Sequence, residues 1–165
     1  MEPYVIDFQA FKTPDNNFLI KELCIVGVRS NVCVHAIVKP NVQYENLCIE
    51  MRCNVHYLTK YFHGIPWTHG YVNWEDTLSL LQNTVHNASV IYIKGSERAT
   101  YIRSLCKNIT VIDLDTLGCP RASPTQMHTL HCPYVKHKYN YTRYACSFRN
   151  ANIYRDWIRC RFKYR

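Results

Sequence analysis

The order of the short apolar runs is the feature that most constrains the fold of this chain. Runs rich in β-forming residues occupy 4–11, 18–28 and 32–38, with only short polar segments between them. Such runs favour strands, and short connections between consecutive strands favour antiparallel pairing. The sequence therefore predicts an antiparallel three-stranded meander at the start of the chain.

Helical and strand patterns alternate after the meander. Asn73 is typical of a helix N-cap, and Glu75 and Asp76 follow in the first turn, where negative charge suits the helix dipole. Two continuously apolar runs, 90–93 and 111–114, predict buried strands, and the segment 97–106 between them predicts a helix. Residues 44–51 could also be helical. The whole order predicts an α/β fold, with a mixed sheet and helices on both faces.

The last third of the chain has a different character. Residues 118–144 contain three prolines and no clear hydrophobic period, so we expect an irregular loop that carries several Cys and His side chains. A basic C-terminal helix and tail follow over 145–165, with the helix ending near residue 160. At 165 residues the chain fits a single domain, 1–165.

The first residues and the cysteines bear on the compartment. A basic stretch followed by a long apolar run is missing from the N-terminal residues, and no apolar run approaches the roughly 20 residues that span a bilayer. Nine cysteines without regular spacing fit a reducing compartment. We therefore expect an intracellular protein, cytoplasmic or nuclear, that has no membrane partner.

The net charge of +8 is concentrated at the end of the chain. Residues 134–165 contain nine Lys/Arg and one acid, Asp156, whereas the acids and bases of 1–133 balance. Basic side chains interleaved with rings can neutralise phosphates and stack on bases. The alternative is an amphipathic helix with a solvated basic face. The candidate nucleic-acid-binding residues are Arg149, Arg155, Arg159, Arg161, Lys163, Arg165, Tyr141 and Tyr144.

Several local motifs resemble those of the proofreading-type three-prime-to-five-prime exonucleases, which share the ribonuclease H fold. The motifs are VIDFQ (5–9), HGIPW (63–67), VIYIKGSERATYI (90–102), VIDLDTLG (111–118) and ACSFRNA (145–151). The resemblance covers nearly the whole chain. It implies a ribonuclease-H-like mixed sheet and a cleft that binds nucleic acid.

The resemblance breaks at the catalytic positions. That family needs four carboxylates that converge on two divalent metals, which activate water and stabilise the leaving oxygen. Asp7 matches the first acid, but Gln9 stands at the second and Asn150 at the last. Ala145 stands at the position of the general-base histidine. We therefore expect no catalytic residues beyond a remnant Asp7, so that magnesium or manganese would bind only if Glu97 or Asp113 completed an unorthodox site.

Two further resemblances suggest another kind of metal site. Motifs such as DFQ (7–9), KEL (21–23) and DLDTLGCP (113–120) resemble uncharacterised insect proteins that derive from mobile elements or viruses. The chain is also similar, more distantly, to the Maelstrom domain of the small-RNA silencing pathway. That domain has an exonuclease-like fold without the usual acids, and carries a Glu-Cys-His-Cys zinc set.

The late loop supplies suitable zinc ligands. Cys119, Cys132, His137 and Cys146 form a candidate Cys3His set, with His128 and His131 as alternates. Thiolates and an imidazole match the tetrahedral preference of structural zinc. If the Maelstrom pattern holds, Glu22 replaces Cys119. Buried thiols and a solvated histidine without metal are the alternative.

Three hypotheses on function remain open. The first is a catalytically inactive exonuclease-like domain that binds RNA or single-stranded DNA and contains structural zinc. The second is a metal-dependent nuclease that uses Asp7 with Glu97 or Asp113. The third is a protein-interaction module that reuses the old cleft. A steep fall of affinity with salt would favour the first hypothesis over the third.

Overall fold

The computed structural model describes residues 1–140 and 142–164, and its N-terminal part is the predicted meander. Strands β1 (Glu2–Lys12), β2 (Phe18–Gly27) and β3 (Cys33–Lys39) pair in antiparallel fashion. Residue Asp7 lies opposite Cys24, and Gln9 lies opposite Glu22. The polar residues of the VIDFQ and KEL motifs are therefore neighbours at the centre of the sheet.

Three further strands complete a mixed sheet. Strand β5 (Ala88–Ile93) is parallel to β1, and β6 (Val111–Asp113) is parallel to β5. The two-residue strand β4 (Val72–Asn73) pairs with β3 at the other edge, which gives the order β4-β3-β2-β1-β5-β6. The predicted strands are confirmed, whereas β4 is too short to leave a recognisable sequence pattern.

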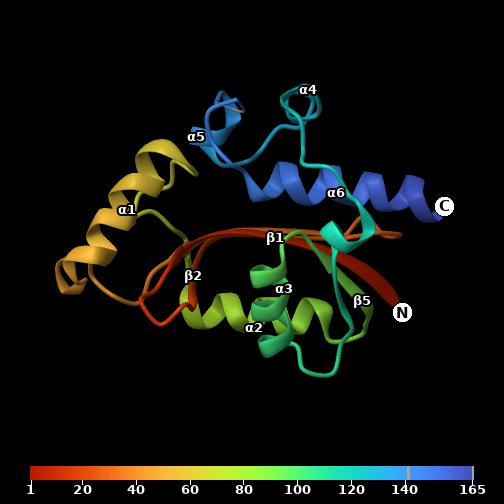
Figure 1. Ribbon diagram of the computed structural model, residues 1–165, viewed down its shortest axis with the longest axis horizontal. Coiled ribbons are helices and arrows are strands. Elements are labelled where there is room, and N and C mark those ends of the chain that lie inside the picture. The colour runs from red at the N-terminus through yellow and green to blue at the C-terminus, as the bar shows by residue number, and fades with distance from the viewer. Residues whose placement is uncertain (141, 165) are drawn as a thin grey trace.

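Helices cover both faces of the sheet, as predicted (Figure 1). Helices α2 (Trp74–Val85) and α3 (Ser96–Leu105) lie on one face, and α6 (Ser147–Phe162) lies across the other. Helix α1 (Ile49–Tyr61) stands beside the sheet and packs against the end of β1 through Met51 and Val55. Within the described residues, no helix has the length and apolar character needed to cross a bilayer.

Alternation along the strands separates the hydrophobic clusters on the two faces of the sheet. Ile6 and Phe8 of β1 belong to the cluster on the α2 and α3 side, whereas Val5 belongs to the cluster with α6. Successive side chains of a strand point to opposite faces, so Asp7 and Gln9 share the α6 face with Val5. Both are buried polar residues. Polar groups placed at the centre of a buried face require partners, and they mark the site described below.

Two segments differ from the sequence prediction in detail. Residues 44–51 divide into a 3-10 turn, Tyr44–Asn46, and the start of α1, which continues to residue 61. The segment 118–144 is largely irregular, as expected, but contains the single-turn helices α4 (Pro124–Met127) and α5 (Val135–Lys138). A capping box of Ser123 and Gln126 begins α4.

Candidate metal centre and the adjoining pocket

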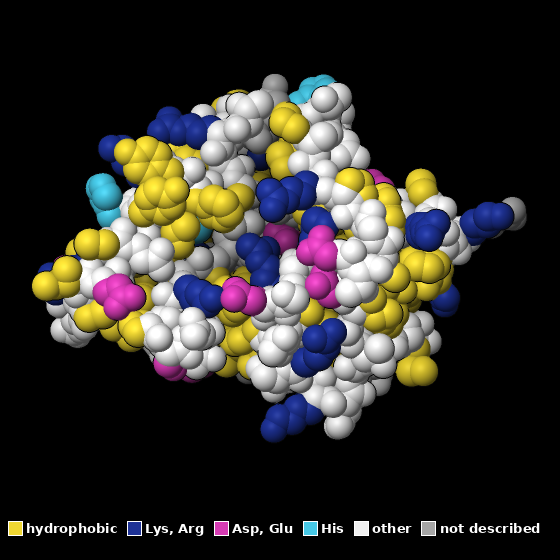
Figure 2. Space-filling model, in the orientation of Figure 1, with side chains coloured by type: hydrophobic (Ala, Val, Ile, Leu, Met, Phe, Trp, Pro, Cys, Tyr) yellow, Lys and Arg dark blue, Asp and Glu magenta, His cyan; other side chains and the backbone are white. Residues whose placement is uncertain are grey.

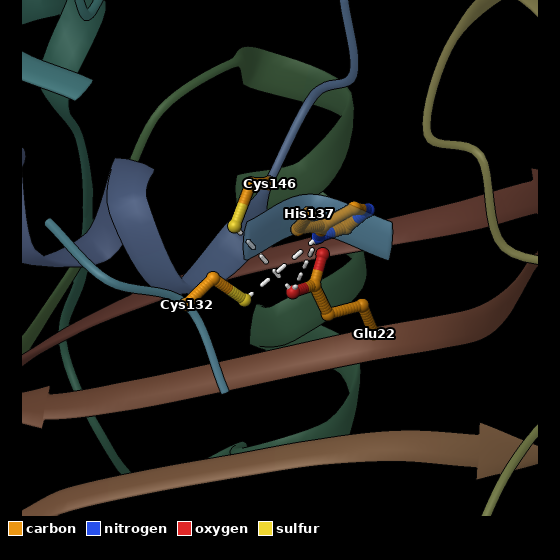
Figure 3. A group of neighbouring side chains, drawn as sticks. All are labelled: Glu22, Cys132, His137 and Cys146. Carbon is orange, nitrogen blue, oxygen red and sulfur yellow. Dashed lines mark hydrogen bonds and ion pairs between the residues drawn. The ribbon is translucent and has the colours of Figure 1, made fainter. Parts of the chain in front are cut away.

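Four buried side chains converge between β2 and the start of α6 (Figure 3). They are Glu22 of β2, Cys132 and His137 of the irregular segment, and Cys146, the N-cap of α6. One ligand atom from each lies within 4.8 Å of those from the others. Two sulfurs, an imidazole and a carboxylate are a suitable set of four ligands for a cation with tetrahedral coordination.

The distances within the cluster are close to those of direct contact. The Oε1 atom of Glu22 lies 3.4 Å from His137 Nδ1 and 3.8 Å from Cys146 Sγ. The sulfur of Cys132 lies 3.9 Å from the same Nδ1 atom. Figure 3 shows the four side chains pointing toward one another from separate segments of the chain.

Neighbouring groups orient the candidate ligands. His137 Nε2 lies 2.6 Å from the carbonyl oxygen of His63, to which it can donate, and this leaves Nδ1 as the nitrogen that faces the cluster. The backbone N–H of Ser147 donates to Glu22 Oε2 at 2.9 Å, and His35 Nε2 lies 2.8 Å from Oε1. Fixed ring orientation and a hydrogen-bonded carboxylate are typical of groups around bound metals.

The electrostatics of the cluster also favour a cation. Burial raises the pKa of Glu22, but hydrogen bonds from His137 and His35 outweigh burial and hold that pKa well below its ordinary value. Burial raises the pKa of the Cys146 thiol well above its ordinary value, and a hydrogen bond with Cys132 and the charge of Glu22 raise it further. Acidic groups this close together require added positive charge to be ionised at the same time. The residues therefore fit a bound divalent cation.

The structure brings together three of the four predicted zinc ligands and corrects the fourth. Cys132, His137 and Cys146 meet, and the alternate Glu22 completes the group instead of Cys119. The backbone N–H of Cys119 donates to the carbonyl oxygen of Leu114, the residue that follows β6, and the Cys119 side chain lies in the hydrophobic cluster under α6.

The two alternate histidines are exposed and lie outside the cluster. The Nδ1 atom of His128 lies 2.6 Å from the carbonyl oxygen of Thr125, within the short helix α4 and its cap. His131 lies one residue before Cys132 but remains exposed. Exposure at the surface separates both rings from the buried donor atoms of the cluster.

A pocket of about 440 Å³ adjoins the candidate metal centre on the same face of the sheet. Figure 2 shows Lys and Arg side chains gathered with Asp and Glu side chains near the middle of the molecular surface in view. Four positions singled out by the exonuclease resemblance line this pocket, namely Asp7, Gln9, Ala145 and Asn150, and Arg98 lies among them. The fold thus brings together residues that are far apart in the sequence.

Asp7 is held by protein groups on two sides. Its carboxylate accepts hydrogen bonds from Arg98 Nη1 at 3.1 Å and from Asn150 Nδ2 at 3.2 Å. Burial raises the pKa of Asp7 to about 6, although the Arg98 charge and the Asn150 hydrogen bond act in the opposite direction. A fixed guanidinium thus provides the positive charge beside the remaining acid.

The pocket also contains unpartnered hydrogen-bond acceptors. Among the described residues, the buried atoms Gln9 Oε1 and Asn150 Oδ1 have no hydrogen-bond partner. Gln9 is 1% exposed, so its amide oxygen is removed from bulk water. A buried acceptor of this kind is costly unless a ligand or an ordered water supplies a donor.

The two alternate acids do not line the pocket. Glu97 forms an ion pair with Lys12 at 3.0 Å, and its side chain is 70% exposed. Asp113 accepts backbone hydrogen bonds from Gly95 and Asp115, both at 2.9 Å, and so fixes the turns that follow β5 and β6. Neither acid is placed to share a cation with Asp7.

The basic C-terminal helix divides into anchored and exposed residues. Arg149 is a correction to the predicted nucleic-acid set, because it is buried and donates to the carbonyls of Leu130, His137 and Lys138. These bonds hold the irregular segment against α6. Its guanidinium is thereby removed from the surface that a phosphate could reach.

The remaining residues of that set differ in exposure. Arg159 donates to Val28 and Ser30, and Arg155 pairs with Asp156 at 3.1 Å. The helix end leaves Arg161 and Lys163 exposed, whereas Tyr144 is half-buried against Gly64. Tyr141 and Arg165 lie outside the described residues.

Sequence reasoning missed several residues of the site. Lys94 and Arg121 line the pocket, and His35 and His63 contact the metal cluster. The Lys94-Gly95 turn directly after a buried strand was the one available signal, since polar residues at the carboxyl ends of parallel strands gather at one edge. No protein-family model matches the chain, and no curated protein matches its sequence.

Proposed function

We propose that this chain is a single-stranded nucleic-acid-binding domain with a ribonuclease-H-like fold, no two-metal nuclease activity and a structural zinc. The strand arrangement supports the fold proposal. Strand β1 has one antiparallel neighbour, β2, and one parallel neighbour, β5, and helices pack on both faces.

One observation carries the proposal: bases outnumber acids among the described residues that line the pocket. Lys94, Arg98 and Arg121 line it together with only two carboxylates, Asp7 and Asp115. Asp7 is paired with Arg98. Asp115 is paired with Lys94.

This balance argues against a two-metal site and for an anionic ligand. Magnesium requires charged oxygen ligands, and two-metal catalysis needs several carboxylates at once. A pocket with an excess of cations, in a chain whose net charge is +8, favours the binding of phosphates instead.

Zinc is the cation that the Glu22, Cys132, His137 and Cys146 cluster fits best. Two thiols and an imidazole favour zinc over magnesium or calcium, which prefer oxygen ligands. When bound, the metal supplies a crosslink between β2 and the segment 132–146. That crosslink fixes the start of α6, and thereby holds Ala145 and Asn150 at the pocket.

A fluorescence-anisotropy titration with labelled single-stranded RNA and DNA oligonucleotides tests the proposal. The logarithm of the affinity should fall linearly with the logarithm of the salt concentration, with a slope of about 0.7 per phosphate neutralised. The strands should remain full-length after incubation with magnesium or manganese. The proposal would be overturned if the protein bound neither RNA nor DNA. It would also be overturned if the strand were progressively shortened and Asp7→Asn abolished that shortening.

A further inference from the structure

An exposed group of rings lies at the C-terminal end of α1, next to the pocket. Tyr57 and Tyr61 are each 59% exposed, and Phe62, the C-cap, is 45% exposed. Figure 2 shows a hydrophobic surface patch over this end of α1. The two tyrosines are one helical turn apart, with ring centroids 5.4 Å from each other. We call Tyr57, Tyr61 and Phe62 the ring platform.

The ring platform is not part of the protein core. Helix α1 packs on the sheet through Met51 and Val55, with Leu58 packed against the same cluster. Tyr57 and Tyr61 belong to none of the three core clusters of the described residues. Burying large rings stabilises a fold, and rings left in water on one surface mark a contact site.

Positive charge accompanies the platform. The Nζ atom of Lys60 lies 5.2 Å from the centroid of Tyr61, and the only acid of α1, Glu50, is in the first turn at the opposite end. Rings beside a cation, at the end of the helix away from its acid, suit a polyanion whose bases can stack more than an apolar protein surface.

The platform continues into the pocket. Phe62 itself lines the pocket together with Arg98 and Arg121. The backbone N–H of Ala145, another lining residue, donates to the carbonyl oxygen of Phe62 at 2.8 Å, which ties this end of α1 to the pocket wall. The rings and the cations of the pocket therefore form one continuous surface.

We propose that the ring platform stacks unpaired bases and guides a single strand into the pocket, where Arg121 contacts its phosphates. This inference rests on the proposed function and names its binding surface. Paired bases present no free faces to the rings, so the surface selects single strands over duplexes. The unpartnered acceptors Gln9 Oε1 and Asn150 Oδ1 can accept hydrogen bonds from a hydroxyl or amino group of the strand.

The test measures affinities of a 5′-fluorescein-labelled 12-nucleotide oligouridine and the matching oligothymidine. Tyr57→Ala and Tyr61→Ala should each weaken binding by roughly 5- to 150-fold at every salt concentration, the range expected for loss of a stacked base. Tyr61→Phe retains the ring and should bind like the parent. Arg121→Ala should reduce the slope of log affinity against log salt by about 0.7.

Tyr71 is the matched control: its side chain is 68% exposed, and its backbone N–H donates to the carbonyl oxygen of Ile37 in β3. Its replacement by alanine should leave binding unchanged. All the substituted side chains are exposed, so unchanged unfolding midpoints are expected. If the parent binds and the Tyr61→Ala and Arg121→Ala proteins bind equally well, the platform inference is overturned and the proposed function stands. If the parent binds neither oligonucleotide, both are overturned.

Discussion

Replacing Asp7 by asparagine should change how the stability of the protein depends on pH. Burial raises the pKa of this carboxyl from 3.8 to about 6. The folded state therefore holds the proton more tightly than the unfolded chain does. The stability that this proton contributes is fully present below pH 3.8 and is lost as the pH rises through about 6.

The size of the effect follows from the same two pKa values. Their difference corresponds to about 3 kcal/mol of unfolding free energy. Asparagine cannot ionise. The free energy of unfolding of the parent, relative to Asp7→Asn, should thus fall by up to about 3 kcal/mol between pH 4 and pH 8.

Urea unfolding of both proteins at several pH values measures this difference directly. Because both proteins retain Glu22, Cys132, His137 and Cys146, the pH dependence of that cluster cancels in the comparison. Asp156→Asn is the matched control, since it removes a carboxylate that is 58% exposed on α6. Parallel stability curves for the parent and Asp7→Asn would refute the reasoning.

Three further substitutions test the anchors of the site. Cys132→Ser should abolish metal binding and lower the unfolding free energy by about 3–5 kcal/mol, because buried charged groups lose their cation. The control Cys119→Ser should retain the metal. Elemental analysis and urea unfolding distinguish the two proteins. Gly64→Ala should destabilise by about 1–3 kcal/mol in thermal unfolding, since φ is +70° and a Cβ would lie 2.8 Å from the Tyr144 ring. Arg149→Met should cost at least about 2 kcal/mol of stability in urea, because buried carbonyls lose their donor; a loss of affinity without a loss of stability would contradict this role.

Much of the fold could be predicted because its strands are buried and apolar. The runs around Val5 and Ile91 place hydrophobic side chains on both faces of the sheet, and such continuous runs are typical of buried strands. Helix α1 was harder to predict, since only Met51 and Val55 are buried and its outward face carries rings. A helix whose exposed face is aromatic does not show a clean amphipathic period.

The metal centre could be predicted only in part. Cys132, His137 and Cys146 are close in the sequence, so their residue types alone suggested that they bind the same metal ion. Glu22 is more than a hundred residues away, and only the packing of α6 on β2 brings it to the same point. Cys119 was a candidate by residue type, but its side chain lies in the hydrophobic cluster on the α6 side of the sheet.

The role of Arg149 could not be predicted from charge. Basic residues are mostly exposed, so clustered arginines near the C-terminus indicated a surface for phosphates. The carbonyls that bind its guanidinium belong to an irregular segment whose path follows no sequence period. The sequence thus showed that the segment is positively charged, but it did not show which of its basic residues face solvent.

Elemental analysis of the natively purified protein is the most direct test of the central claim, that one metal centre lies beside a pocket that binds anions. The account predicts about one zinc per chain, held by Glu22, Cys132, His137 and Cys146, and the same content in Asp7→Asn. It predicts no stoichiometric magnesium or manganese. A folded protein without zinc, or one with two divalent ions that Asp7→Asn removes, would contradict the account.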